Sequence, residues 1–222
     1  MWTKVVGLGV ATVLAIKSST PPNAPPKDPA AGKVVSEGAL AAFLVKWGQH
    51  LAALLYVVAY CTYMYAMWQQ EMAHNAFAEA SSFARWYPSD VIALAMVVAG
   101  ALLRLWCYRT LARHFTFSLT ILRNHELVQS GPYALLLHPS YTGAVLVQAG
   151  YLALLVWDRL WWLQPWPLSL LRFDIACAVL ALLTAAAFYR RVSVEEAALH
   201  RHFGKRWEAH TATRKRFIPF LF

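Results

Sequence analysis

The sequence predicts an all-α, multi-pass integral membrane protein with about five transmembrane helices and a cytosolic C-terminal amphipathic helix. Of its 222 residues, 59% are hydrophobic and only 14% are charged, whereas a soluble domain of this length carries about 25% charged residues. The apolar excess therefore has to face lipid. Several apolar stretches also reach the roughly 20 residues that cross about 30 Å of hydrocarbon. Finally, the basic residues are distributed as the positive-inside rule expects.

Five apolar stretches are expected to form the spans. The first, Val5–Ile16, is short and could be a secretory signal peptide. No small-residue cleavage site follows cleanly before Lys17, so a retained span is expected instead. The remaining four are Leu40–Trp68, Val91–Tyr108, Ala134–Trp157 and Phe173–Tyr189.

The formal net charge of +9 could suggest a nucleic-acid partner, but the positions of the basic residues favour membrane topology. If the N-terminus lies outside the cytosol, 16 of the 20 Lys and Arg residues fall in cytosolic segments. This asymmetry matches the positive-inside rule, and anionic lipid headgroups add to it. No nucleic-acid partner is therefore expected. All three cysteines lie within apolar runs, where packing is expected rather than disulfides or metal ligation.

The segments between the spans are polar or rich in proline. Ser18–Pro29 contains five of the eleven prolines and is expected to be a flexible linker. Gln69–Asp90 is expected to form a short helix or loop, and Arg109–Ser130 a polar, basic connector. From Arg190 the chain continues as a charged amphipathic helix, whose first segment Gly204 can end. Three parts are expected: 1–38 with the first span and linker, 39–108 with two spans and their loop, and 109–222 with the last helical hairpin and the cytosolic tail.

Two polar clusters lie beside these apolar stretches, and ionisable groups in such places usually mark a site. The first contains HELV at 125–128, SGPY at 130–133 and HPSYTG at 138–143. Pro139 leaves a backbone carbonyl without its helical partner, and broken helix ends of this kind line polar cavities in membrane proteins. The alternative is that the histidines and tyrosines here only anchor the helix at headgroup level.

The second cluster follows the last span. Arg191 and Glu195 are four residues apart and share one helix face, so they can pair. The alternative is a solvated helix with an exposed ion pair, which contributes little to stability. His200 and His202 point to different faces, so chelation of a metal by this pair is not expected.

Together the two clusters resemble the isoprenylcysteine carboxyl methyltransferases, and most closely the fungal members. The resemblance rests on the order HELV, SGPY, HPSYTG, an apolar hairpin, EExxLxxxFGxxW at 195–207 and the terminal RFIPF at 216–220, and it covers roughly the second half of the chain. It implies a multi-pass enzyme of the endoplasmic reticulum membrane whose active site faces the cytosol. Such an enzyme uses S-adenosyl-L-methionine to methylate the C-terminal carboxylate of the prenylated cysteine in processed CaaX proteins.

The resemblance also implies roles for individual residues. Arg191 corresponds to the arginine that meets the substrate, so it is the expected catalytic and substrate-binding residue. The expected cofactor-binding residues are His125, Glu126, Leu127, Val128, Tyr133, His138, Pro139, Ser140, Tyr141 and Glu195. No metal is implied, and the expected partners are the prenylated cysteine and membrane lipid, with no prediction of oligomeric state.

The sequence departs from the family at several positions. Leu137 stands where an arginine usually precedes the histidine-proline pair, and a leucine cannot replace a guanidinium. Arg214 or Arg216 could supply that charge from a shifted position. Ser118 stands where fungal relatives have a glutamate, and His210 replaces a usual tyrosine.

Three other functions stay open at this point. A related methyltransferase could act on phospholipid amines or another lipid, although Arg191 would repel an amine and so favours a carboxylate. A sterol-reductase-like enzyme would share the glycine-tryptophan and proline pattern near the C-terminus but would bind NADPH. A catalytically inactive membrane scaffold would fit the departures at Leu137 and Ser118.

Overall fold

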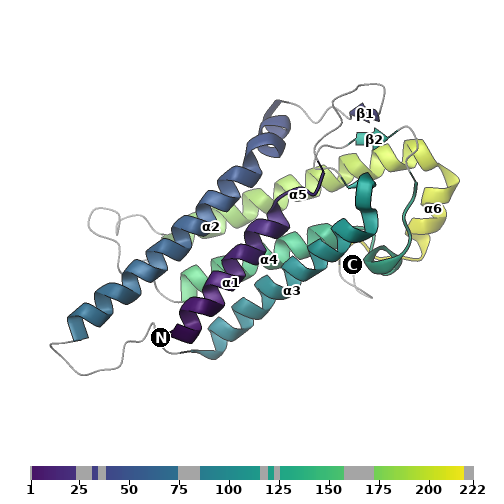
Figure 1. The fold of residues 1–222 in the computed structure, drawn as a ribbon. Coiled ribbons are helices and arrows are strands. Elements are labelled where there is room, and N and C mark those ends of the chain that lie inside the picture. The colour runs from purple at the N-terminus through teal and green to yellow at the C-terminus, as the bar shows by residue number, and fades with distance from the viewer. Residues whose placement is uncertain are drawn as a thin grey trace.

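The computed structural model describes residues 2–23, 32–34, 39–74, 86–115, 120–122, 126–157 and 173–217. Within these residues the chain forms six α-helices and two short 3₁₀ helices, so the all-α fold class is confirmed (Figure 1). The α-helices are α1 Trp2–Ser19, α2 Ala39–His74, α3 Pro88–Leu111, α4 Pro139–Trp157, α5 Phe173–Phe203 and α6 Lys205–Ala212. The 3₁₀ helices are η3 Ala112–His114 and η4 Gly131–Ala134.

Two three-residue strands accompany the helices. β1, Gly32–Val34, pairs antiparallel with β2, Thr120–Leu122, and Gly32 lies opposite Leu122. The sequence did not predict this pairing, because three residues are too few for an alternating pattern of apolar side chains to stand out. The two strands join the segment after α1 to the connector between α3 and α4.

Helices α3 and α4 pack closely because small residues line their contact. A Cβ atom added to Gly100 of α3 would lie 2.6 Å from the carbonyl oxygen of Gly143 in α4. One added to Gly150 would lie 2.6 Å from the carbonyl oxygen of Ala93. Glycine and alanine let helix backbones approach in this way within membranes. The pair forms the centre of the bundle, and it fixes the start of α4 relative to α3.

Helix α1 packs against this pair through small and polar residues. Ala11 and Ala15 are fully buried, and the hydroxyl of Thr12 hydrogen-bonds with that of Tyr151 in α4. The Tyr151 ring also contacts Tyr56 of α2, with ring centroids 4.6 Å apart. The sequence placed Val5–Ile16 in a helix but gave no sign of these contacts, which join α1, α2 and α4.

A buried ion pair joins α1 to α3 at the end of the bundle where the chain begins. Nζ of Lys4 lies 2.7 Å from Oδ2 of Asp90, and the two side chains are 0% and 1% exposed. The backbone N–H of Tyr87 donates to the same oxygen at 2.9 Å. The ammonium also lies 5.5–6.0 Å from the ring centroids of Tyr63, Trp86 and Tyr87, so aromatic faces add to its stabilisation.

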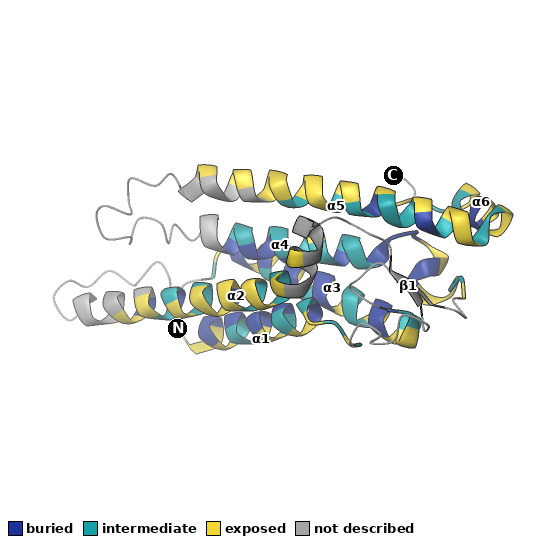
Figure 2. Ribbon diagram, turned by 90° about the horizontal axis from the view of Figure 1, so that it is seen from above, coloured by how far each residue is buried: buried dark blue, intermediate teal, exposed yellow. Residues whose placement is uncertain are grey.

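The outer faces of the bundle carry exposed apolar residues. Figure 2 shows exposed positions along α2 and α5. Leu54, Val58 and Leu182 are 51–71% exposed. In the described part of the chain, one helical stretch, Pro88–His114, is long and apolar enough to cross a bilayer. The arrangement of five spans stays a prediction.

Helix boundaries agree with most of the local signals in the sequence. The helix expected from Ala134 begins instead at Pro139, because residues 131–134 form the 3₁₀ helix η4. Helix α5 ends at Phe203, and Gly204 follows with a φ of +52° before α6 begins. The sequence predicted that the helix ends at this glycine. The expected linker at 18–29 and the expected short helix or loop at 69–90 lie partly outside the described residues. Of their described parts, 18–19 belong to α1, 69–74 to α2 and 88–90 to α3.

Candidate active site

The site begins where the chain turns into α4. Gly131 has a φ of +58°, and a Cβ atom there would lie 2.9 Å from Oγ1 of Thr110. A side chain at this position is therefore strained both by conformation and by space. After η4 the chain passes through a turn at Leu135 and an isolated bridge between Leu136 and Lys215. Pro139 then starts α4, because its missing N–H is not needed in a first helical turn. This geometry places His138 and Tyr141 at the head of α4.

The C-terminal segment, residues 214–217, pairs with this turn. The N–H groups of Leu137 and His138 donate to the carbonyls of Lys215 and Arg216 at 2.9 and 3.0 Å. The Thr142 hydroxyl donates to the carbonyl of Phe217 at 2.8 Å. These bonds attach the end of the chain to the head of α4, at the end of the bundle opposite the N-terminus (Figure 1).

Tyr141 is the meeting point of α4 and α5. Its hydroxyl donates to Oε2 of Glu195 at 2.9 Å and accepts from Nε of Arg191 at 2.8 Å. Its ring packs edge-on against Phe188, with centroids 5.5 Å apart. The sequence predicted that Arg191 and Glu195 share a helix face. The structure adds that both reach the same phenol.

A second set of contacts surrounds His138. Nε2 of His138 lies 3.0 Å from Oε1 of Glu196, and Nη2 of Arg216 lies 2.8 Å from Oε2 of the same carboxylate. Burial alone raises the pKa of Glu196, but its bonds with His138 and Arg216 outweigh that effect and lower the pKa overall. The carboxylate therefore stays ionised at neutral pH.

Glu196 faces the site as well, although it is the next residue after Glu195 in the same helix. One residue beyond Glu195 is a rotation of about 100° around a helix. The rotation carries Glu196 from Tyr141 to His138, which immediately precedes α4. Because the C-terminal segment closes the far side, Glu196 is enclosed rather than solvated, with a side chain 17% exposed. The doubled acidic pair was the signal in the sequence that could have indicated this.

Arg104 supports the head of α4 from α3. Its Nη1 donates to the carbonyl of Ser140 at 3.2 Å, and its Nε donates to the carbonyl of Ser18 at 2.7 Å. The hydroxyl of Tyr108 donates to the same Ser18 carbonyl. Arginine at this position thus ties the ends of α1 and α3 to the first turn of α4. In the sequence, nothing distinguishes Arg104 from the other basic residues on the cytosolic side.

Two buried aromatic residues lie near the site, Tyr133 close to Glu195 and His210 close to His138. Tyr133 is 9% exposed, and burial, with nearby Cys107 and Glu195, raises the pKa of its phenol well above the usual range. His210 of α6 is 3% exposed and contacts the ring of Trp207. Burial, followed by the charges of Arg214 and His138, lowers the pKa of His210 to about 4.

The other expected site residues are placed less centrally. Glu126 is exposed, and Leu127 and Val128 are half-buried. Among the described residues no hydrogen bond joins these three to His138 or Tyr141. Pro139 is buried, whereas Leu137, the departure from the usual arginine, is 8% exposed. His125 and Ser118 lie outside the described residues.

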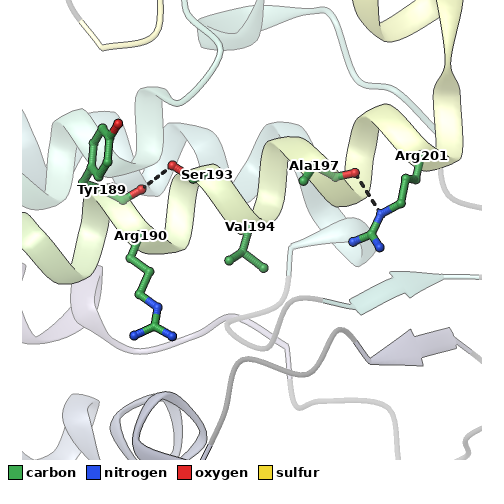
Figure 3. Close-up of a pocket in the computed structure, with 6 residues that line it drawn as sticks. All are labelled: Tyr189, Arg190, Ser193, Val194, Ala197 and Arg201. Carbon is green, nitrogen blue, oxygen red and sulfur yellow. Dashed lines mark hydrogen bonds between the residues drawn. The ribbon is translucent and has the colours of Figure 1, made fainter.

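A surface hollow of about 420 Å³ lies along α5, and neither Arg191, Glu195 nor Glu196 lines it (Figure 3). Within it the Ser193 hydroxyl donates to the carbonyl of Tyr189, and Nε of Arg201 donates to that of Ala197. The described residues that line it are Tyr189, Arg190, Ser193, Val194, Ala197 and Arg201. The hollow is therefore separate from the polar contacts around Tyr141 and His138.

The donor set around Tyr141 fits a small polar ligand. Oε2 of Glu195 is bonded to Tyr141, while Oε1 makes no hydrogen bond with the described part of the chain. An ionised carboxylate accepts from hydroxyl or ammonium groups. Arg191 brings a planar cation that suits a carboxylate. The arrangement can thus bind a ligand with hydroxyl or amino groups next to a second ligand with a carboxylate.

Comparisons with known proteins agree with this chemistry. Residues 92–201, from α3 into α5, match the isoprenylcysteine carboxyl methyltransferase (ICMT) family. The chain is also similar to a protein of Arabidopsis thaliana, protein-S-isoprenylcysteine O-methyltransferase B, with 28% identity over 138 residues. That similarity covers 61% of this chain and 61% of the plant protein. The chain therefore spans about three fifths of its relative's length.

Proposed function

From the match of residues 92–201 to the isoprenylcysteine carboxyl methyltransferase family, we propose that the chain is a member of that family and methylates the C-terminal carboxylate of prenylated cysteine. The substrates would be processed CaaX proteins, and the methyl donor S-adenosyl-L-methionine. The observation that carries the proposal is the pair of bonds from Arg191 and Glu195 to the Tyr141 hydroxyl. These bonds hold a carboxylate-binding cation beside a hydroxyl-binding anion.

Arg191 would hold and orient the substrate carboxylate. A guanidinium can make two parallel hydrogen bonds to a carboxylate, which fix both distance and plane. In this chain Nε of Arg191 is already committed to Tyr141. Because Tyr141 lies in the first turn of α4, this bond sets the direction in which the terminal nitrogens of the guanidinium point.

Glu195, Tyr141 and His138 would contribute most to holding the cofactor. The unbonded Oε1 of Glu195 suits a hydroxyl or amino group, and the rings of Tyr141 and His138, 5.8 Å apart, form an aromatic wall. When bound, the cofactor supplies the methyl group on a sulfonium. The remaining proposed cofactor-binding residues are His125, Glu126, Leu127, Val128, Tyr133, Pro139 and Ser140.

The reaction demands placement more than proton transfer. A C-terminal carboxylate is ionised at neutral pH, so no general base is needed. Correct alignment of the attacking oxygen can remove several kcal/mol of the barrier. The chain provides alignment through the bonds that join α4, α5 and the C-terminal segment around Tyr141 and His138.

We further propose an endoplasmic reticulum location, five spans and a cytosolic active site, with residues 109–222 as the methyltransferase core. The match to this membrane family supports a membrane location. Placing the active site in the cytosol is supported by the concentration of Lys and Arg residues in the segments beside it. The fungal type of the enzyme is proposed on the motif order alone.

The test is transfer of a labelled methyl group from S-adenosyl-L-methionine to N-acetyl-S-farnesylcysteine by membranes that contain the full chain. We expect transfer by the wild type and a loss of at least about tenfold in Arg191→Lys, because lysine cannot make the planar two-point contact. Arg190→Lys is the matched control, since Arg190 lines the hollow along α5 and Arg191 does not. Absence of transfer by the wild type, or equal transfer by Arg191→Ala, would overturn the proposal.

A further inference from the structure

The backbone of His138 is held on both sides. Its N–H donates to the carbonyl of Arg216 at 3.0 Å, and its carbonyl accepts from the N–H groups of Tyr141 and Thr142 at 3.1 and 3.2 Å. The ring contacts Phe217, with centroids 5.9 Å apart. His138 is 3% exposed. The ring therefore has a fixed position, and the placement of its proton is the remaining variable.

Glu196 determines which ring nitrogen carries that proton. Both oxygens of its carboxylate are occupied, Oε1 by Nε2 of His138 and Oε2 by Nη2 of Arg216. An ionised carboxylate can only accept hydrogen bonds. Nε2 of His138 must therefore be the donor, and in a neutral imidazole the proton on one nitrogen leaves the other as an acceptor.

Nδ1 of His138 is then an acceptor without a partner. Nδ1 makes no hydrogen bond with the described part of the chain. Nδ1 of His210 is buried, whereas Nδ1 of His138 is not sealed from solvent. A polar atom of this kind beside Tyr141 is placed to receive a hydrogen bond from a ligand.

Cationic groups lie on the other sides of this carboxylate. Arg216 lies on the far side of Glu196 and balances the charge of that carboxylate. His210 of α6 and Arg214 of the C-terminal segment also face this region.

We propose that Glu196, backed by Arg216, is a positioning residue that fixes His138 as the Nε2–H tautomer and so presents Nδ1 as an acceptor to a hydroxyl or ammonium group of the cofactor. The proposal rests on the proposed function, because it concerns the same site. It also assigns a role to Arg216: its guanidinium acts on His138 through Glu196.

The first test reads the tautomer directly and needs no cofactor. The full chain is labelled with ¹⁵N at histidine, placed in detergent micelles and studied by NMR, with His138→Gln to assign the signal. We expect an unprotonated Nδ1 and a protonated Nε2 in the wild type, and a mixture of tautomers in Glu196→Ala. A protonated Nδ1 in the wild type, or an unchanged signal in Glu196→Ala, would overturn the inference.

The second test measures binding of S-adenosyl-L-methionine at equilibrium. Glu196→Ala should weaken binding by about tenfold, the loss of one well-placed hydrogen bond. Glu196→Gln should bind better than Glu196→Ala, because the amide oxygen still accepts from Nε2–H. Glu208→Ala is the matched control: Glu208 pairs with His200 at the same 3.0 Å, but in an exposed place.

A double-mutant cycle separates positioning from general support of the fold. If Glu196 acts through His138, the double variant Glu196→Ala with His138→Ala should bind no more weakly than His138→Ala alone. Additive losses would overturn the inference. A wild type that shows the expected tautomer but binds no S-adenosyl-L-methionine would overturn the proposed function instead. Binding unaffected by Glu196→Ala would overturn the inference and leave the function standing.

Discussion

Gly143 of α4 and Gly100 of α3 touch backbone to backbone. A Cβ atom on Gly143 would lie 2.7 Å from the carbonyl oxygen of Gly100 and 2.8 Å from Cγ of Arg104. Gly143 follows Tyr141 by only two residues, so the contact also determines where the head of α4 stands. Close packing of α3 on α4 and the geometry of the candidate active site are therefore coupled.

Gly143→Ala should destabilise the protein and weaken cofactor binding together. The added methyl group meets rigid backbone, and overpacking of this kind costs about 1–3 kcal/mol. Thermal unfolding in detergent and S-adenosyl-L-methionine binding are the measurements. Gly48→Ala in α2 is the control, because nothing lies within 4 Å of its Cβ position. Equal unfolding midpoints for Gly143→Ala and wild type would contradict the close contact.

Tyr141→Phe should weaken cofactor binding while leaving the fold intact. The change removes the hydroxyl that Arg191 and Glu195 share, but it keeps the ring against Phe188. Loss of hydrogen bonds to charged groups should reduce the affinity for S-adenosyl-L-methionine by roughly tenfold or more. Tyr189→Phe, at an exposed position lining the hollow, should bind as the wild type does. Unchanged binding in Tyr141→Phe would remove the central contact from the proposed site.

Lys4→Met should be strongly destabilising, by about 3–5 kcal/mol, because it leaves Asp90 buried without its charge partner. Asp90 has a second buried oxygen, Oδ1, that already lacks a partner in the described residues. Adding Asp90→Asn to Lys4→Met should recover part of the loss, which chemical unfolding in detergent would measure. If Lys4→Met alone unfolds as the wild type does, the pair does not hold α1 in the bundle.

Local signals in the sequence predicted the helices well. Pro139 at the start of α4 and Gly204 after α5 act through their own backbone constraints, which neighbours cannot change. That Tyr141 and Glu195 would share one site followed from the family resemblance, whereas the hydrogen bond between them came from the structure. The helix boundaries depend on residues close together in the sequence, and the shared site depends on a motif order already known from the family.

Contacts between distant segments could not be predicted in the same way. The bond of Glu196 with Arg216 requires the C-terminal segment to return to the head of α4, and backbone pairing of Leu137 with Lys215 directs that return. Backbone pairing leaves little trace in side-chain identity. The ion pair of Lys4 could not be predicted either, because its partner Asp90 lies 86 residues away in the sequence.

The stability of the C-terminal region should fall as the pH falls from about 6.5 towards 4. His210 has a pKa lowered to about 4, whereas an unfolded histidine titrates near 6.5. Between these values the unfolded chain binds a proton that the folded chain does not, so protons favour unfolding. The contribution is complete above pH 6.5 and is lost on acidification.

His210→Tyr, which restores the usual family residue, should reduce this acid sensitivity. Thermal unfolding midpoints at pH 7.5 and pH 5 are compared, and the difference should be smaller in His210→Tyr than in the wild type. His200→Gln is the control, since His200 is 54% exposed and should leave the pH dependence unchanged. An equal pH dependence in His210→Tyr would mean that other groups control acid unfolding.

The active-site end of the bundle should face the cytosol. The end of α3, the head of α4 and the end of α5 lie together, and α6 and the C-terminal segment lie with them (Figure 1). The chain contains no natural Asn-X-Ser/Thr acceptor, so single substitutions can report topology. Ala209→Asn creates an acceptor with Thr211 in α6, and Pro167→Asn creates one with Ser169 between α4 and α5.

Expressed with microsomal membranes, the full chain should be glycosylated in Pro167→Asn and unmodified in Ala209→Asn. Glycosylation of Ala209→Asn would place α6 in the lumen, and a cytosolic active site could not then be maintained, because α6 follows directly on the helix that carries Arg191 and Glu195.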